Sequence, residues 1–228
     1  MKFGVVIFPG SNCDHDMIYA FGNIMEQEVV PLWHKDKSLQ GVDGVLLPGG
    51  FSYGDYLRSG ALARFSPVMN EVMDFAANGG FVFGVCNGFQ ILCESGLLPG
   101  TLLHNSNQKF ICKNVHIVPD AKQSHLTRYL EPQVLKIPVA HGEGRYYASS
   151  DTLAEMRNNG QILFRYCDAT GNISQNSNPN GSVENIAGIC NERKNVYGMM
   201  PHPERAVDDE LGNTDGVRIL QSILKMMK

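Results

Sequence analysis

The stretch Phe81-Val-Phe-Gly-Val-Cys86-Asn-Gly-Phe-Gln90 decides the fold and marks the candidate nucleophile. The apolar run Phe81–Val85 predicts a buried strand, and the pattern of Gly88–Glu94 predicts a helix. Between them stands a turn of the form G-x-C-x-G, the cysteine counterpart of the G-x-S-x-G nucleophile elbow. The glycines two residues to either side of Cys86 allow strand and helix to approach closely, because they carry no Cβ.

Cys86 is therefore the candidate catalytic nucleophile. Its sulfur is expected above the sheet at the positive end of the following helix, where the helix dipole favours the thiolate, the reactive form of cysteine. The alternative is a buried cysteine in a glycine-punctuated turn. The predicted strand before it and helix after it favour the nucleophile.

Outward from this turn, short apolar runs alternate with helical patterns, which predicts an α/β fold. Its central sheet should be mostly parallel, with helices on both faces, because such strands are buried on both sides. Two later runs around the polar turn Asn191–Lys194 predict an antiparallel extension. We expect a single domain of residues 1–228. The segments behind this prediction are the strand runs Lys2–Phe8, Val42–Leu47, Gly181–Cys190 and Asn195–Met200, helical spacing over Met17–Met25, a helix that starts at Ser66-Pro67, and a last helix over Val217–Met227.

The stretch Gly171–Asn185 is rich in Asn, Ser and Gly. We expect a solvated loop there rather than a binding segment, although loops of this length are often functional.

The composition excludes several classes of protein. The chain has 228 residues and a net charge of −4, and its Lys and Arg are scattered, which argues against a nucleic-acid binder. The apolar run Phe3–Phe8 is too short for a signal peptide or a membrane span, so we expect a cytoplasmic protein. The cysteines form no CxxC pair, so neither a disulfide framework nor a metal site is expected. They are Cys13, Cys86, Cys93, Cys112, Cys167 and Cys190.

Acyl chemistry at Cys86 needs backbone donors for an oxyanion. The amide of Asn87, directly after the nucleophile, is one expected donor. The second should come from a loop at the same sheet edge, and Leu47–Ser52 is the best candidate because its paired glycines let an N–H turn towards a ligand. Either Gly50 or Phe51 would supply it. A plain tight turn is the alternative for this loop.

The general base has two candidates, His141-Gly-Glu143 and His202-Pro-Glu204. In an extended segment, residues two apart face the same side, so the Glu could orient the His. Pro203 keeps His202 out of helical geometry and favours that extended form. Spacing therefore favours His202 and leaves His141 open.

These motifs together resemble the class I glutamine amidotransferases, whose elbow reads G-x-C-x-G-x-Q and whose other catalytic pair reads H-P-E. Here they are Gly84-Val-Cys86-Asn-Gly88-Phe-Gln90 and His202-Pro203-Glu204. The resemblance implies a flavodoxin-like sheet, a triad of Cys86, His202 and Glu204, and a role for Gln90 in holding the substrate glutamine. It selects His202 over His141.

Further stretches resemble, within that family, the glutaminase subunits that serve purine biosynthesis. The resemblance implies a synthetase subunit that uses ATP and Mg to convert formylglycinamide ribonucleotide with the released ammonia, and a small accessory subunit. This chain lacks a G-x-x-x-x-G-K-[ST] loop, so no cofactor or metal is expected in it. The stretches are Phe8–Asp14, Pro48–Asp55, Ile137–Arg145, Asn176–Gly188 and Pro201–Arg205.

Two rival functions remain open at this point. Another cysteine hydrolase, such as a peptidase or deglycase-like protein, should carry a His just after the elbow, but the first His after Cys86 is His104. A non-catalytic binding subunit would not need both the elbow and the H-P-E pair. The roles of His141, Glu143 and Arg145 are not predicted beyond a contact at the rim of the site.

Overall fold

The computed structural model describes residues 1–120, 124–130 and 133–228, and a nine-stranded mixed sheet dominates this part of the chain. Its strands are β1 (Lys2–Ile7), β2 (Glu28–Trp33), β3 (Gly44–Leu47), β4 (Phe81–Val85), β6 (Ile111–Pro119), β7 (Leu135–His141), β9 (Ile162–Cys167), β10 (Ile186–Cys190) and β11 (Val196–Met199). The spatial order is β2-β1-β3-β4-β11-β10-β9-β6-β7. Strands β5 (Thr101–Leu103) and β8 (Arg145–Tyr147) form a separate antiparallel pair.

The sheet has a parallel half and an antiparallel half. Strands β2, β1, β3, β4 and β11 run parallel to one another. From β11 through β10, β9 and β6 to β7, each neighbouring pair is antiparallel. The predicted α/β fold with an antiparallel extension is therefore confirmed.

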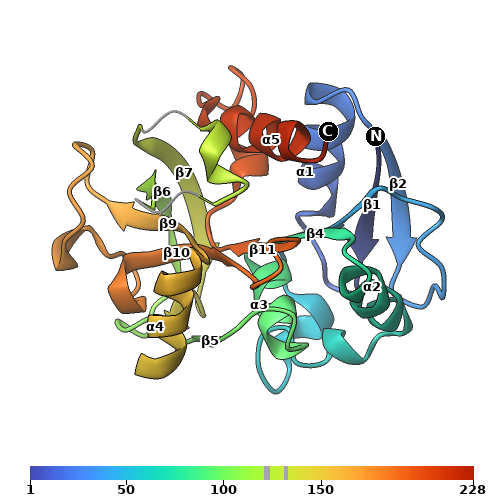
Figure 1. Cartoon of the computed structure of the whole chain (residues 1–228), viewed down its shortest axis with the longest axis horizontal. Helices are drawn as coiled ribbons and strands as arrows, with labels where there is room; N and C mark the ends of the chain where they lie inside the picture. Colours follow the sequence, from blue (N-terminus) through green and yellow to red (C-terminus); the bar gives the residue numbers. More distant parts are fainter. Residues whose placement is uncertain (121–123, 131–132) are drawn as a thin grey trace.

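Helices cover both faces of the parallel half, as expected. Figure 1 shows α1 (Asp14–Tyr19) and α5 (Asp215–Met226) on one side of the sheet, and α2 (Pro67–Ala77) and α3 (Asn87–Glu94) on the other. The fifth helix, α4 (Ser150–Asn159), lies beside the antiparallel half. The expected helix over Met17–Met25 differs in detail. After Tyr19 it continues as a π-helical turn, Ala20–Ile24, in which the Met25 N–H donates to the Ala20 carbonyl.

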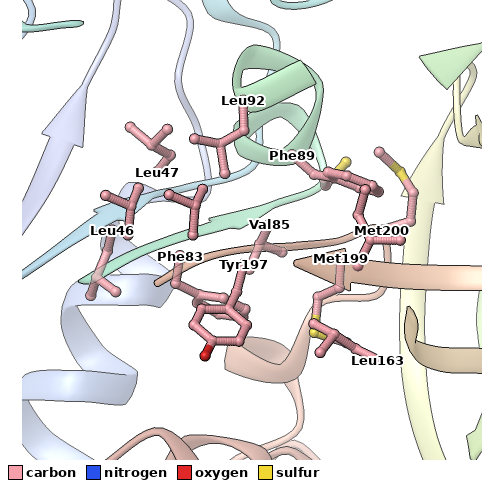
Figure 2. Close-up of a cluster of buried hydrophobic side chains, with 14 of the residues drawn as sticks. Leu46, Leu47, Phe83, Val85, Phe89, Leu92, Leu163, Tyr197, Met199 and Met200 are labelled. Carbon is pink, nitrogen blue, oxygen red and sulfur yellow. The ribbon is translucent and has the colours of Figure 1, made fainter. Parts of the chain in front are cut away.

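The core is thickest around β4, which lies between β3 and β11. Every residue of β4 is buried, as are the first six residues of α3. Figure 2 shows Phe89 and Leu92 of α3 over one side of the sheet and Phe83 and Tyr197 on the other. Burial on both faces fixes the end of β4, and with it the position of the residue that follows.

The Asn- and Ser-rich stretch Gly171–Asn185 is more ordered than a solvated loop. Asn180 and Ser182 are buried, and the Asn180 amide donates to the Gly144 carbonyl at 2.8 Å. Asn185 donates to the Tyr166 carbonyl at 3.0 Å. The expectation was wrong for the second half of this stretch, because its polar side chains satisfy buried backbone carbonyls.

No helix in the described ranges combines the length and the apolar character needed to cross a membrane.

Gly88 provides a test of the strand–helix contact. A Cβ at this position would overlap the carbonyl oxygen of Leu47, which belongs to the neighbouring strand β3. We expect Gly88→Ala to lower the free energy of unfolding by about 3 kcal/mol, as overpacking of a rigid core does. Urea unfolding followed by circular dichroism measures this change.

The matched control for Gly88→Ala is Gly22→Ala. Gly22 is also helical, and an added Cβ would meet nothing closer than 3.7 Å. Equal stability of the two variants would contradict the close approach at Gly88.

Candidate active site

Cys86 occupies a strained turn between β4 and α3. Its φ is +52° and its ψ is −105°, in the half of conformational space that favours glycine. Such a conformation costs on the order of 1–3 kcal/mol and persists only where the surroundings impose it. The side chain is buried, and its Sγ lies 3.6 Å from the Ala140 carbonyl oxygen.

His202 and Glu204 form a buried pair on the segment after β11. Each is 1% exposed, and His202 Nδ1 lies 2.7 Å from Glu204 Oε1. The His202 N–H donates to the Pro138 carbonyl at 2.8 Å, which ties this segment to β7. His202 is non-helical, as expected, at φ −99° and ψ 87°, but the segment is not extended, because Glu204 lies in a 3₁₀ turn over Pro203–Arg205. The two side chains meet nevertheless.

Burial and charge act in opposite directions on His202. Burial lowers the pKa of its imidazole, and the negative charges of Glu204 and Cys86 outweigh burial, so the net pKa is raised. The imidazole is therefore cationic at neutral pH. Its Nε2 has no partner among the described residues other than the Cys86 sulfur, which contributes to the raised pKa.

Gly49 allows the nucleophile and the imidazole to approach each other. A Cβ built on Gly49 would lie 2.7 Å from His202 Cε1, 3.1 Å from Cys13 Sγ and 3.4 Å from Cys86 Cβ. The glycine therefore marks the point around which these three side chains gather.

The alternative pair, His141 and Glu143, is not formed. His141 Nδ1 lies 3.0 Å from Asn105 Oδ1. Glu143 instead accepts from the Ser59 N–H at 3.3 Å and lies 3.4 Å from His104 Nε2. Burial, and then the nearby His202, lower the pKa of His141 to about 4, so this imidazole stays neutral. The two histidines therefore differ although their sequence motifs look alike: His202 interacts with a carboxylate, and His141 interacts with the Asn105 amide instead.

The candidate oxyanion donors are only partly free. The Asn87 N–H belongs to the first turn of α3, where backbone donors have no helical acceptor. The Phe51 N–H, in contrast, donates to the Gly10 carbonyl at 3.1 Å. This bond removes Phe51 from the donors in the present conformation and leaves Gly50, whose φ of +138° only glycine adopts readily.

A cavity of about 160 Å³ lies in front of Cys86; we refer to it as the substrate cavity. Gln90 lines it and is held at both ends of its amide, because Nε2 donates to the Glu143 carbonyl at 2.7 Å and Oε1 accepts from Asn87 Nδ2 at 2.9 Å. Asn87 Oδ1 accepts the Ser52 N–H at 3.2 Å. The residues that line the substrate cavity are Gly50, Phe51, Asp55, Ser59, Cys86, Gln90, His104, Phe110, Ala140, His141, Gly142 and Glu143.

Asp55 and Glu143 bring two carboxylates to the substrate cavity. Asp55 was not predicted as a site residue, whereas Glu143 was expected only as the alternative partner of a histidine or as a contact at the rim of the site. Burial is the main cause that raises the pKa of Asp55 to about 6. Hydrogen bonds from Ser59 and Asn87 oppose the rise, and the charge of Glu143 adds to it. The sequence carried a weak signal for Asp55, which ends the stretch Pro48–Asp55 that follows a predicted strand.

A second, smaller cavity of about 50 Å³ adjoins the first; we refer to it as the side cavity. Arg205 lies in its wall and donates from Nε to Asp16 Oδ2 at 2.8 Å and from Nη2 to Cys13 Sγ at 3.0 Å. The residues that line the side cavity are Asn12, Cys13, Gly50, Phe51, Phe110, Ala140, His202 and Arg205. Across the described ranges, no three His, Cys, Asp or Glu side chains are grouped to hold a metal ion.

Comparisons with known proteins show what the whole chain is similar to. Residues 1–216 match the family model for the CobB/CobQ-like glutamine amidotransferase domain. The phosphoribosylformylglycinamidine synthase subunit PurQ of Koribacter versatilis is 55% identical over 228 residues, which covers 100% of this chain and 99% of that protein. A chain in the structure of PurLQS from Thermotoga maritima has a TM-score of 0.85 at 41% identity and covers 100% and 99% of the two chains. A glutamine amidotransferase from the same organism, at 14% identity, TM-score 0.60 and coverage of 100% and 98%, shows the fold alone.

The raised pKa of Asp55 predicts a dependence of stability on pH. The folded chain binds a proton at Asp55 more tightly than an unfolded chain does, so stability falls as pH rises from about 4 to about 6. Asp55→Asn removes that penalty. After allowance for solvent screening of this half-buried group, the variant should gain about 1 kcal/mol above pH ~6 and nothing near pH ~4.

Urea unfolding at several pH values across this window measures the difference between Asp55→Asn and the unmodified chain. Asp74→Asn, on the exposed face of α2, removes the same charge far from the substrate cavity and serves as the control. A gain from Asp55→Asn that is independent of pH would contradict the assignment.

Proposed function

The chain belongs to the CobB/CobQ-like glutamine amidotransferase family, and from this we infer that it is the glutaminase subunit of phosphoribosylformylglycinamidine synthase. It hydrolyses glutamine to glutamate and ammonia. A synthetase subunit uses the ammonia, with ATP, to convert formylglycinamide ribonucleotide to formylglycinamidine ribonucleotide in purine biosynthesis.

One observation carries the assignment of the catalytic residues. A cysteine in a strained strand-to-helix turn stands beside a buried, cationic imidazole that a carboxylate holds at 2.7 Å. This is the arrangement of nucleophile, acid–base group and orienting group that acyl transfer requires. The substrate cavity in front of Cys86 gives a glutamine side chain access to the sulfur.

In the first half-reaction, the Cys86 sulfur attacks the side-chain carboxamide carbon of glutamine. The amides of Gly50 and Asn87 donate to the oxyanion that forms, and each such donor typically contributes about 10²–10³ in rate. Protonated His202 gives its proton to the leaving nitrogen, and ammonia departs as the C–N bond breaks. A glutamyl thioester on Cys86 and a neutral His202 remain.

In the second half-reaction, the neutral imidazole acts as the base. His202 takes a proton from water, and the water oxygen attacks the thioester carbonyl. The C–S bond then breaks, and glutamate leaves with Cys86 restored as the thiolate. Glu204 stabilises the imidazolium in both halves, since its carboxylate faces Nδ1.

Gln90 serves mainly to position the walls of the substrate cavity. Its amide links α3 to the backbone of Glu143, and Asn87 links α3 to the loop after β3. A glutamine bound in the substrate cavity would contact surfaces that these two side chains hold in place.

The complete reaction needs partner subunits, because this chain supplies ammonia but does not use it. The relative from Thermotoga maritima belongs to a PurLQS assembly, and the chain itself acts with a synthetase subunit and a small accessory subunit. ATP and Mg belong to the synthetase, and in the proposed mechanism this chain hydrolyses glutamine with its own side chains and no cofactor. We place it in the cytoplasm as a single domain of residues 1–228, and the fact that all six of its cysteines are free thiols supports a reducing compartment.

Replacement of the nucleophile tests the mechanism. We expect Cys86→Ala to abolish glutamine hydrolysis, because no thioester can form, while ammonia-dependent synthesis by the assembled complex continues. Glutamate release and product formation from added ammonia measure the two halves separately. Cys167→Ala removes a buried cysteine from β9 and should retain glutaminase activity. Glutamate release by Cys86→Ala would refute the mechanism.

Dependence on the partner is a separate prediction. The isolated chain should hydrolyse glutamine weakly, and its rate should rise when the synthetase subunit and the accessory subunit are added with nucleotide substrates. Glutamate production, assayed with each component omitted in turn, measures this coupling. Full turnover by the chain alone would argue against a subunit role.

A further inference from the structure

Cys86 and His202 line two different cavities that have part of their walls in common. Cys86 lines the substrate cavity, and His202 lines the side cavity. Four residues contribute to both walls: Gly50, Phe51, Phe110 and Ala140. The substrate cavity therefore gives access to Cys86, and the side cavity gives a second approach to the His202 imidazole.

The His202 imidazole has a strong hydrogen-bond partner at only one of its two nitrogens. Its Nδ1 is occupied by Glu204, and its buried Nε2 has no partner among the residues the structure describes other than the Cys86 sulfur. Sulfur is a weak acceptor, and buried polar atoms almost always have a partner in the protein or in ordered water, so a small bound molecule would complete the bonding of Nε2. The side cavity, at about 50 Å³, is too small for an amino acid but has room for water, which takes about 30 Å³ in the liquid.

The remaining walls suit a small neutral molecule. Cys13 is buried, and burial followed by the charge of Glu204 raises the pKa of its thiol to about 12, so it remains uncharged. The Arg205 guanidinium is already bound to Asp16 and to Cys13 Sγ. Asn12 is exposed at the edge of the side cavity and leaves a way in from solvent.

We propose that the side cavity binds the water that hydrolyses the glutamyl thioester, and that the Cys13 side chain sets the room for it. The inference rests on the proposed function and adds a site for the second substrate of that reaction. Water in the side cavity gives a proton to His202 Nε2, and its oxygen attacks the thioester carbonyl. The glutamyl chain meanwhile stays in the substrate cavity, so water need not wait for that cavity to empty.

Filling the side cavity should slow deacylation and spare acylation. Cys13→Leu places a larger side chain in the cavity, and Cys13→Val fills it less. In the assembled complex with glutamine, we expect steady-state glutamate release by Cys13→Leu to fall at least about tenfold, equivalent to about 1.4 kcal/mol. The fraction of Cys86 trapped as thioester after acid quench should rise, as measured by mass spectrometry. Cys13→Ser, close to cysteine in size, should trap less thioester than Cys13→Leu.

A diazo-ketone analogue of glutamine alkylates Cys86. The rate of this alkylation reports whether a Cys13 variant is folded and whether its Cys86 is still accessible from the substrate cavity. It should change less than about twofold in Cys13→Leu, because alkylation uses the substrate cavity and needs no water. Cys167→Leu enlarges a cysteine of similar burial on β9 and should trap no extra thioester. If Cys13→Leu fails the alkylation control, Cys13→Val replaces it.

The outcomes separate the two claims. Equal losses in alkylation and in glutamate release in both Cys13→Leu and Cys13→Val, or slow release without trapped thioester, would overturn the water site and leave the proposed function intact. Absence of alkylation and of thioester at Cys86 in the unmodified chain would overturn the proposed function itself.

Discussion

The structure depends on one constrained backbone position, the left-handed turn at Cys86. A side chain there is unfavourable by itself, and the turn is maintained because β4 and α3 are clamped between neighbours. Gly88 lies against the carbonyl of Leu47, and Gly84 lies against the backbone of Gly88. Burial of β4 on both faces offsets the strain. The catalytic sulfur therefore owes its position to core packing of the sheet rather than to contacts of its own.

The antiparallel half of the sheet has a distinct task, since it positions the second catalytic group. The backbone of His202 is bound to Pro138 in β7, and the sulfur of Cys86 faces the carbonyl of Ala140 in the same strand. Both catalytic residues thus contact the same strand, β7, which lies at the edge of the sheet. The parallel half of the sheet carries the nucleophile, and the antiparallel half, through β7, holds the nucleophile and His202 in position relative to each other.

The sequence was sufficient for features that depend on short spacing. The elbow around Cys86, the pairing of His202 with Glu204 and the antiparallel pair β10–β11 all arise from residues close together in the chain. Features that join distant segments could not be predicted. The Phe51 amide is taken by Gly10, and Gln90 is held by a carbonyl 53 residues away. The opposite charge states of His141 and His202 also have a tertiary origin, because the buried His141 meets Asn105, 36 residues away, instead of Glu143.

Gly49 has a consequence for how this gene can vary. Its φ lies outside the left-handed range, so its backbone alone would accept other residues. Any Cβ there would nevertheless press on the His202 imidazole. Alanine or serine at position 49 would therefore lower the catalytic rate even if the protein still folds. Purifying selection would then remove such substitutions because of the lost activity and not because of lost stability.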